Sequence, residues 1–98
     1  MKHLFIINPA AGKRGSTDAL AGRIKTLFDA RGLPYQITLT TSAGDAERIT
    51  RQAAEQGEAV RVYACGGDGT LNEVVNGAAG HSFMAVTNYP KGTGNDFL

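Results

Sequence analysis

Short apolar segments typical of strands alternate along this chain with segments of helical spacing, and that order restricts the folds open to it. The strand-like segments are rich in β-branched and aromatic residues and cover residues 2–7, 35–40, 59–65 and 83–87. Each intervening segment is long enough to bring the next strand back in parallel. We therefore expect a doubly wound, three-layer α/β domain with a parallel sheet of about four strands.

Three segments between these strands have the apolar spacing of amphipathic helices. The first begins at N-cap candidates in 16–18 and ends at Gly32, the second covers 45–56, and the third runs to Gly80. The apolar residues that carry this spacing are Leu20, Ile24, Leu27 and Phe28 in the first helix, Ala46, Ile49 and Ala53 in the second, and Leu71, Val74, Val75 and Ala78 in the third.

Composition excludes several classes of protein. A chain of 98 residues with 42% hydrophobic residues suits one globular domain, and a formal charge of +1 argues against a general nucleic-acid binder. One cysteine, Cys65, allows no internal disulfide, and the two histidines have no zinc-site spacing. No apolar stretch approaches the roughly 20 residues of a membrane span, and no secretory signal is visible. We expect a cytoplasmic protein.

Three polar or glycine-rich loops follow the expected strands, at 8–15, 66–70 and 88–96. In an open parallel sheet, ligands bind beyond the carboxyl ends of the strands, so these loops should share one edge. Glycines at 66, 67 and 69 let backbone N–H groups approach a phosphate, and the start of the next helix adds its positive dipole end. A tight turn without a ligand is the alternative interpretation of this loop.

Polar residues around the second loop are candidates for chemistry. The carboxylate of Asp68 would repel a phosphate unless it holds Mg²⁺ or accepts a proton, which favours a functional role. Thr70 either caps the third helix or binds a phosphate oxygen. Asn72 and Glu73, expected in the first turn of that helix, could orient water or a metal ion.

Two familiar phosphate-binding motifs are absent. Gly12-Lys13 lacks a glycine five residues earlier, and Arg14 replaces the Ser/Thr of a Walker A motif. Asn72 replaces the third glycine of a dinucleotide fingerprint, and no acidic residue follows at the ribose-reading position. An NAD-binding Rossmann domain is therefore not favoured.

These loops resemble the signatures of the diacylglycerol kinase catalytic family, which includes diacylglycerol, sphingosine and related bacterial lipid kinases. Residues 66–77 resemble its nucleotide-binding signature, residues 90–97 its second conserved loop, and Asn8-Pro9-x-x-Gly12 agrees at the start. The resemblance covers essentially all 98 residues. It implies the fold of an N-terminal domain of the NAD kinase/diacylglycerol kinase type.

The resemblance also implies a site for ATP and Mg²⁺. The loop after the first strand would contact the phosphates, Asp68 would be the catalytic residue and the possible metal contact, and Thr93 would close the site. The residues implied in binding are Asn8, Pro9, Ala10, Ala11, Gly12, Thr40, Gly67, Asp68, Gly69, Thr70, Leu71, Asn72, Glu73 and Thr93. Family members carry their lipid cleft, a further metal site and the expected general base in a second, β-rich domain. Since nothing here resembles that domain, we interpret residues 1–98 as the nucleotide-binding domain of a longer kinase.

The implied reaction is transfer of the γ-phosphoryl group of ATP to a lipid hydroxyl, with transient contact between protein and membrane surface. Asp96 stands where sphingosine kinases tend to have alanine, which favours diacylglycerol or a related glycerolipid. An NAD kinase relative is one alternative, because it shares the Gly-Gly-Asp-Gly-Thr core, although residues 71–77 and 92–96 resemble the lipid kinases. A non-enzymatic α/β module that binds a nucleotide or a partner protein is the other. The oligomeric state stays open.

Overall fold

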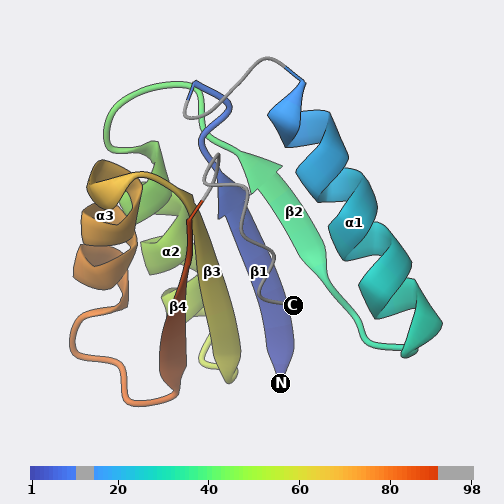
Figure 1. The fold of residues 1–98 in the computed structure, drawn as a ribbon. Coiled ribbons are helices and arrows are strands. Elements are labelled where there is room, and N and C mark those ends of the chain that lie inside the picture. The colour runs from blue at the N-terminus through green and yellow to red at the C-terminus, as the bar shows by residue number, and fades with distance from the viewer. Residues whose placement is uncertain (11–14, 91–98) are drawn as a thin grey trace.

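A computed structural model describes residues 1–10 and 15–90 as a parallel sheet between two layers of helix (Figure 1). The doubly wound α/β class predicted from the sequence is confirmed. Within the described residues the strands are β1 (Lys2–Ile7), β2 (Gln36–Leu39), β3 (Val60–Gly66) and β4 (Met84–Pro90), and the helices are α1 (Ser16–Ala30), α2 (Asp45–Glu55) and α3 (Asp68–Ala78).

The strand order in the sheet is β2-β1-β3-β4, and every neighbouring pair is parallel. β1 and β3 are the two central strands. The chain continues from β1 to β2 at one edge of the sheet, and from β3 to β4 at the opposite edge. The carboxyl ends of β1 and β3 therefore form the topological switch point of the sheet, where open α/β sheets bind their ligands. Ile7 of β1 lies opposite Cys65 of β3 in this register.

The two faces of the sheet form separate cores. α1 covers one face of the sheet, and α2 and α3 cover the other (Figure 1). Phe5 and Ile7 of β1 pack with α1, and Leu4 and Ile6 of the same strand pack with α2 and α3. All four side chains are buried, because helices cover both faces of a parallel sheet. This double coverage explains why Leu4–Ile7 is a continuous apolar run and does not alternate with polar residues.

α2 is rotated relative to the sequence-based prediction. Its fully buried residues are Ala46, Thr50 and Ala54, whereas Ile49 and Ala53, predicted to face inward, are half-buried. The reason is close packing on α3 at Gly77, where an added Cβ would lie 2.6 Å from the backbone oxygen of Glu47 and 2.7 Å from Thr50 Cβ. The hydroxyl of Thr50 donates to the Ala46 carbonyl at 2.7 Å, so burial leaves it hydrogen-bonded.

The other predicted helix faces are largely confirmed. In α1 the side chains of Leu20, Ile24 and Phe28 are buried, and Leu27 is half-buried. In α3 Val74 is buried but Val75 is 48% exposed, because it lies on the solvent side of the helix.

Most element boundaries differ from the prediction by one residue, and two differences are larger or change a predicted role. The N-cap of α1 is Gly15, in a left-handed conformation with φ 82°, and the predicted cap candidates at 16–18 already lie inside the helix. β4 extends to Pro90, so residues 88–90, predicted as loop, pair with Ala64, Cys65 and Gly66 of β3. Proline is tolerated there because β4 is an edge strand of the described sheet.

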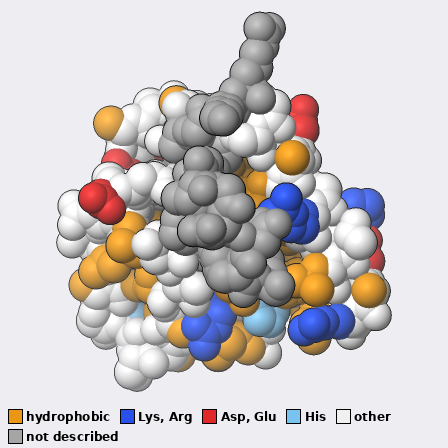
Figure 2. Space-filling view, in the orientation of Figure 1, with side chains coloured by type: hydrophobic (Ala, Val, Ile, Leu, Met, Phe, Trp, Pro, Cys, Tyr) orange, Lys and Arg blue, Asp and Glu red, His pale blue; other side chains and the backbone are white. Residues whose placement is uncertain are grey.

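Charge on the surface is scattered. In the orientation of Figure 2, the Lys and Arg side chains of the described residues lie in separate spots and form no continuous basic surface on that face. This distribution is in keeping with the net charge of +1. Among the described helices, none has the length and apolar character that crossing a bilayer requires.

Candidate functional site

The loops after β1 and β3 share one edge of the sheet, as predicted, and meet there at the switch point. Residues 91–96 of the third predicted loop lie outside the described residues. The backbone N–H of Asn8 donates to the Cys65 carbonyl at 3.0 Å, which places Asn8 beside Gly66. A Cβ added to Gly66 would lie 2.5 Å from Thr70 Oγ1 and 3.3 Å from Asn8 Cβ. The absence of a side chain at position 66 therefore lets Asn8 and Thr70 approach each other across the end of β3.

A cleft of about 650 Å³ opens at this edge of the sheet. Its walls come from the loop after β1, from residues 40–43 after β2 with Ala46 of α2, and from the first turns of α3. Its volume lies within the range of about 300–1,000 Å³ that is usual for small-molecule sites. The lining residues are Asn8, Pro9, Ala10, Thr40, Thr41, Ser42, Ala43, Ala46, Gly69, Thr70 and Glu73.

Many of the predicted site residues come together in this cleft, from three separate parts of the sequence. Those that line it are Asn8, Pro9, Ala10, Thr40, Gly69, Thr70 and Glu73. Gly67, Asp68 and Asn72 are exposed at or near the start of α3 without lining the cleft, and Leu71 packs against the apolar core. Ala11, Gly12 and Thr93 lie outside the described residues.

The start of α3 presents backbone donors at the cleft. The first hydrogen bond of the helix runs from the Leu71 N–H to the Gly67 carbonyl, at 3.2 Å. Gly67 is the N-cap, and no side chain of the described residues caps this end of α3. The alternative prediction that Thr70 caps this helix is therefore wrong. N–H groups in a first helical turn lack intrahelical acceptors and carry the positive end of the helix dipole, so they favour an anion.

Asn72 and Glu73 lie in the second turn of α3, one turn later than predicted, because the helix already begins at Asp68. Asp68 is exposed at this first helical position. The described residues contain no cluster of three or more metal-ligating side chains.

Thr41, Ser42, Ala43 and Ala46 line the cleft but were not among the predicted site residues. Asp45 organises this segment. Its Oδ2 accepts from the backbone N–H and the hydroxyl of Thr41, both at 2.7 Å, and from the Ser42 N–H at 3.2 Å. These hydrogen bonds hold the pKa of the Asp45 carboxyl well below its usual range, and the bond from the Thr41 N–H has the largest effect. Two hydroxyl residues followed by an aspartate were the available signal.

Glu73 joins the same segment to α3. Its Oε2 accepts from the Gly44 N–H at 3.2 Å and its Oε1 from the Ala46 N–H at 3.1 Å. Gly44 is the N-cap of α2, in a left-handed conformation with φ 88° that suits glycine. Both oxygens of the carboxylate are thus bound to backbone amides at the start of α2.

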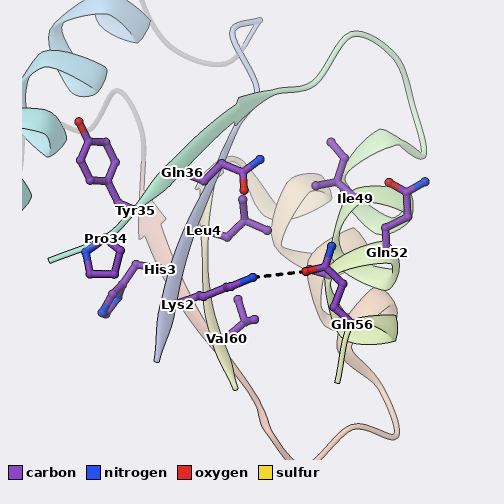
Figure 3. Close-up of a pocket in the computed structure, with 11 residues that line it drawn as sticks. Lys2, His3, Leu4, Pro34, Tyr35, Gln36, Ile49, Gln52, Gln56 and Val60 are labelled. Carbon is purple, nitrogen blue, oxygen red and sulfur yellow. Dashed lines mark hydrogen bonds between the residues drawn. The ribbon is translucent and has the colours of Figure 1, made fainter. Parts of the chain in front are cut away.

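A second cavity, of about 300 Å³, lies at the opposite edge of the sheet, beside the first residues of β1, β2 and β3 (Figure 3). Lys2 spans it, with Nζ 3.4 Å from Gln56 Oε1. On its other side His3 Nδ1 lies 2.9 Å from the Tyr63 hydroxyl oxygen, and burial lowers the pKa of the imidazole. None of the predicted site residues lines this cavity, so we place the candidate site at the switch point.

Comparison with known proteins identifies the family. A family model described as "Diacylglycerol kinase catalytic domain" matches residues 2–98. The chain belongs to this family. The resemblance noted in the sequence is thereby confirmed.

Individual members of the diacylglycerol kinase catalytic domain family match most of the chain. A protein of Cronobacter sakazakii named "Probable lipid kinase YegS-like" is 43% identical over 89 residues, which are 88% of this chain and 29% of that protein. A Bacillus subtilis protein named "Diacylglycerol kinase" is 39% identical over 96 residues, 95% of this chain and 30% of that protein. The chain thus spans about a third of the length of these relatives.

Solved structures agree with the assignment. A diacylglycerol kinase from Bacillus anthracis superposes with a TM-score of 0.70 at 33% identity, covering 98% of this chain and 35% of that one. A "phosphate-loop protein" solved in solution superposes with a TM-score of 0.60 at 19% identity, covering 95% of this chain and 79% of that one. The second likeness concerns the fold alone.

Proposed function

We propose that this chain is the ATP-binding part of a lipid kinase that transfers the γ-phosphoryl group of ATP to the hydroxyl of diacylglycerol or a related glycerolipid. The observation that carries the proposal is the cleft at the switch point, which joins the loop after β1, Thr40 and the start of α3 in a chain of this family. In the family the lipid cleft belongs to a second, β-rich domain, and we propose the same division of labour here.

The phosphates of ATP would bind at the start of α3. Gly69 has no Cβ to hinder an approaching oxygen, and an added one there would meet nothing within 4 Å, so the space above it is open. The amides of the first turn and the helix dipole favour negative charge at that place. Asn8 shapes the neighbouring wall, because its Oδ1 accepts from the Ala10 N–H at 3.0 Å and fixes the start of the loop after β1.

Phosphoryl transfer requires mainly positioning and neutralisation of charge. Bound Mg²⁺ would neutralise charge on the transferred phosphoryl group. We assign Asp68 to the Mg²⁺–phosphate unit, because it is an exposed carboxylate next to Gly69 of the cleft. The other role open to Asp68 is assistance to the attacking hydroxyl. The lipid would reach the site during transient contact of the protein with a membrane surface.

A turnover assay on the intact protein tests this proposal against its nearest enzymatic rival. ATP and Mg²⁺ are supplied with diacylglycerol in mixed micelles in one arm and with NAD in the other, and phosphorylated product is measured. We expect phosphatidate in the first arm and no NADP in the second. NADP formation would support an NAD kinase relative, and absence of turnover with retained ATP binding would support a binding module.

A further inference from the structure

The carboxylate of Glu73 crosses from α3 to the start of α2. It accepts the N–H groups of Gly44 and Ala46, at 3.2 and 3.1 Å. Such N–H groups at a helix start have no intrahelical acceptor, and a negative charge beside them is stabilised by the helix dipole. Hydrogen bonds to an ionised acceptor are roughly twice as strong as neutral ones. Glu73 therefore closes the anion-attracting end of α2.

The same contact joins two walls of the cleft. Residues 40–46 form one wall, and its upstream end is fixed to the sheet where the Thr40 N–H donates to the Ile7 carbonyl at 2.9 Å. Within that wall, the Asp45 carboxylate accepts from the backbone N–H groups of Thr41 and Ser42 and so fixes its middle part. Glu73 ties its downstream end to α3, the helix that carries Gly69 and Thr70 on the other wall. Glu73 and the close packing of α2 on Gly77 are thus the contacts that join residues 44–46 to α3, and Glu73 is the one of the two that lines the cleft.

We propose that Glu73 is a positioning residue, which sets the width of the nucleotide cleft by holding residues 40–46 and does not itself contact phosphate or Mg²⁺. The inference rests on the proposed function. It also gives an electrostatic reason for a glutamate at this place: a carboxylate lining a triphosphate site repels the ligand, but here both oxygens are bound by backbone donors. With α2 closed by Glu73, the phosphates are directed to the open start of α3.

Substitutions in the intact protein separate positioning from direct binding. Glu73→Gln keeps the shape of the side chain and one acceptor oxygen, whereas Glu73→Ala removes both acceptors. Glu55→Gln is the matched control, because it changes an exposed glutamate at the far end of α2. Amide hydrogen exchange at Gly44 and Ala46 is measured without nucleotide. Kinetics then give KM for ATP, kcat and the Mg²⁺ concentration for half-maximal rate.

We expect exchange at Gly44 and Ala46 to rise by about tenfold or more in Glu73→Ala and less in Glu73→Gln. KM for ATP should rise in the same order, by about tenfold for alanine, with kcat and the Mg²⁺ requirement unchanged within about twofold. Glu55→Gln should match the unchanged protein. A lower kcat and a higher Mg²⁺ requirement with unchanged exchange would overturn the inference, as that is the behaviour of a direct ligand.

Faster exchange with an unchanged KM for ATP would also overturn it, since the contact would then be structural only. Failure of the proposed function would be visible earlier and separately. In that case the unchanged protein would show no ATP binding or turnover, and the positioning role would fall with it. The isosteric Glu73→Gln variant keeps the test decisive if Glu73→Ala does not fold.

Discussion

Replacing Gly66 by alanine tests the geometry of the switch point. The added Cβ would lie 2.5 Å from Thr70 Oγ1 and 2.9 Å from Thr70 Cβ, whereas ordinary contact begins at 3.4 Å. Thr70 or the end of β3 must therefore move by about 0.9 Å, which is the difference between 3.4 Å and the 2.5 Å to Thr70 Oγ1. Overpacking of this kind costs about 1–3 kcal/mol, and a displacement near 1 Å in a site can lower activity by about 100-fold.

The assay has two readouts on the intact protein: the free energy of unfolding in urea and kcat/KM for ATP. We expect Gly66→Ala to lower the first by about 1–3 kcal/mol and the second by about 100-fold. Gly22→Ala is the matched control, because a Cβ on that helical glycine of α1 meets nothing within 4 Å. It should leave activity unchanged and raise stability by about 0.5–1 kcal/mol.

A double variant identifies the source of the clash. Thr70→Ala removes Oγ1, the nearest atom to the added Cβ, so Gly66→Ala in that background should cost less stability than in the unchanged protein. Only stability is compared there, because Thr70 itself lines the cleft. A Gly66→Ala protein that unfolds at the same urea concentration as the unchanged one and keeps its kcat/KM would refute the reasoning.

Three further predictions follow from the site. Asp68→Asn should lower kcat by at least ~100-fold with a much smaller change in ATP affinity, measured by steady-state kinetics and titration; turnover near the original rate would mark Asp68 as a turn residue only. The 98-residue chain alone should bind ATP with a Kd on the order of millimolar, more tightly with Mg²⁺, and should phosphorylate no lipid. NMR titration followed at the amides of Gly67 and Gly69 measures the binding, and lipid phosphorylation by the chain alone would contradict the prediction. Because the pKa of Asp45 is lowered on folding, the stability that its carboxylate contributes is complete above the unfolded-state pKa of about 3.9 and is lost as the pH falls below that value. Urea unfolding at several pH values should therefore show Asp45→Asn to be less stable than the unchanged protein at pH 7 and to lose less stability on acidification.

Most of the fold was predictable because local pattern and global structure agree. The apolar run Leu4–Ile7 and the helical spacing of Leu20, Ile24 and Phe28 each bury the residues expected. Strand order was not predictable, since several orders satisfy the same alternation of strands and helices. The rotation of α2 was missed for a related reason: it depends on Gly77 of α3, whose missing side chain lets Thr50 be buried. A pattern within one helix contains no information on its neighbour.

The candidate site divides in the same way. The loop after β1 and the start of α3 were predictable, because glycines and polar residues directly follow apolar strands. Residues 41–46 of the other wall were not predictable, because their shape depends on hydrogen bonds that two carboxylates accept. One of them, Asp45, is local and left a weak sequence signal. The other, Glu73, is 29 residues from Gly44, and only the packing of α2 on α3 brings them together.

Three carboxylates near one edge of the sheet would be unfavourable for an anionic ligand, unless their charges are used differently. Asp45 and Glu73 each accept hydrogen bonds from backbone N–H groups, which compensate their charge and fix residues 40–46. Asp68 is instead exposed at the start of α3, where a cation shared with phosphate would compensate it. On this reasoning two of the carboxylates shape the cleft, and the third is the one suited to the Mg²⁺ that phosphoryl transfer needs.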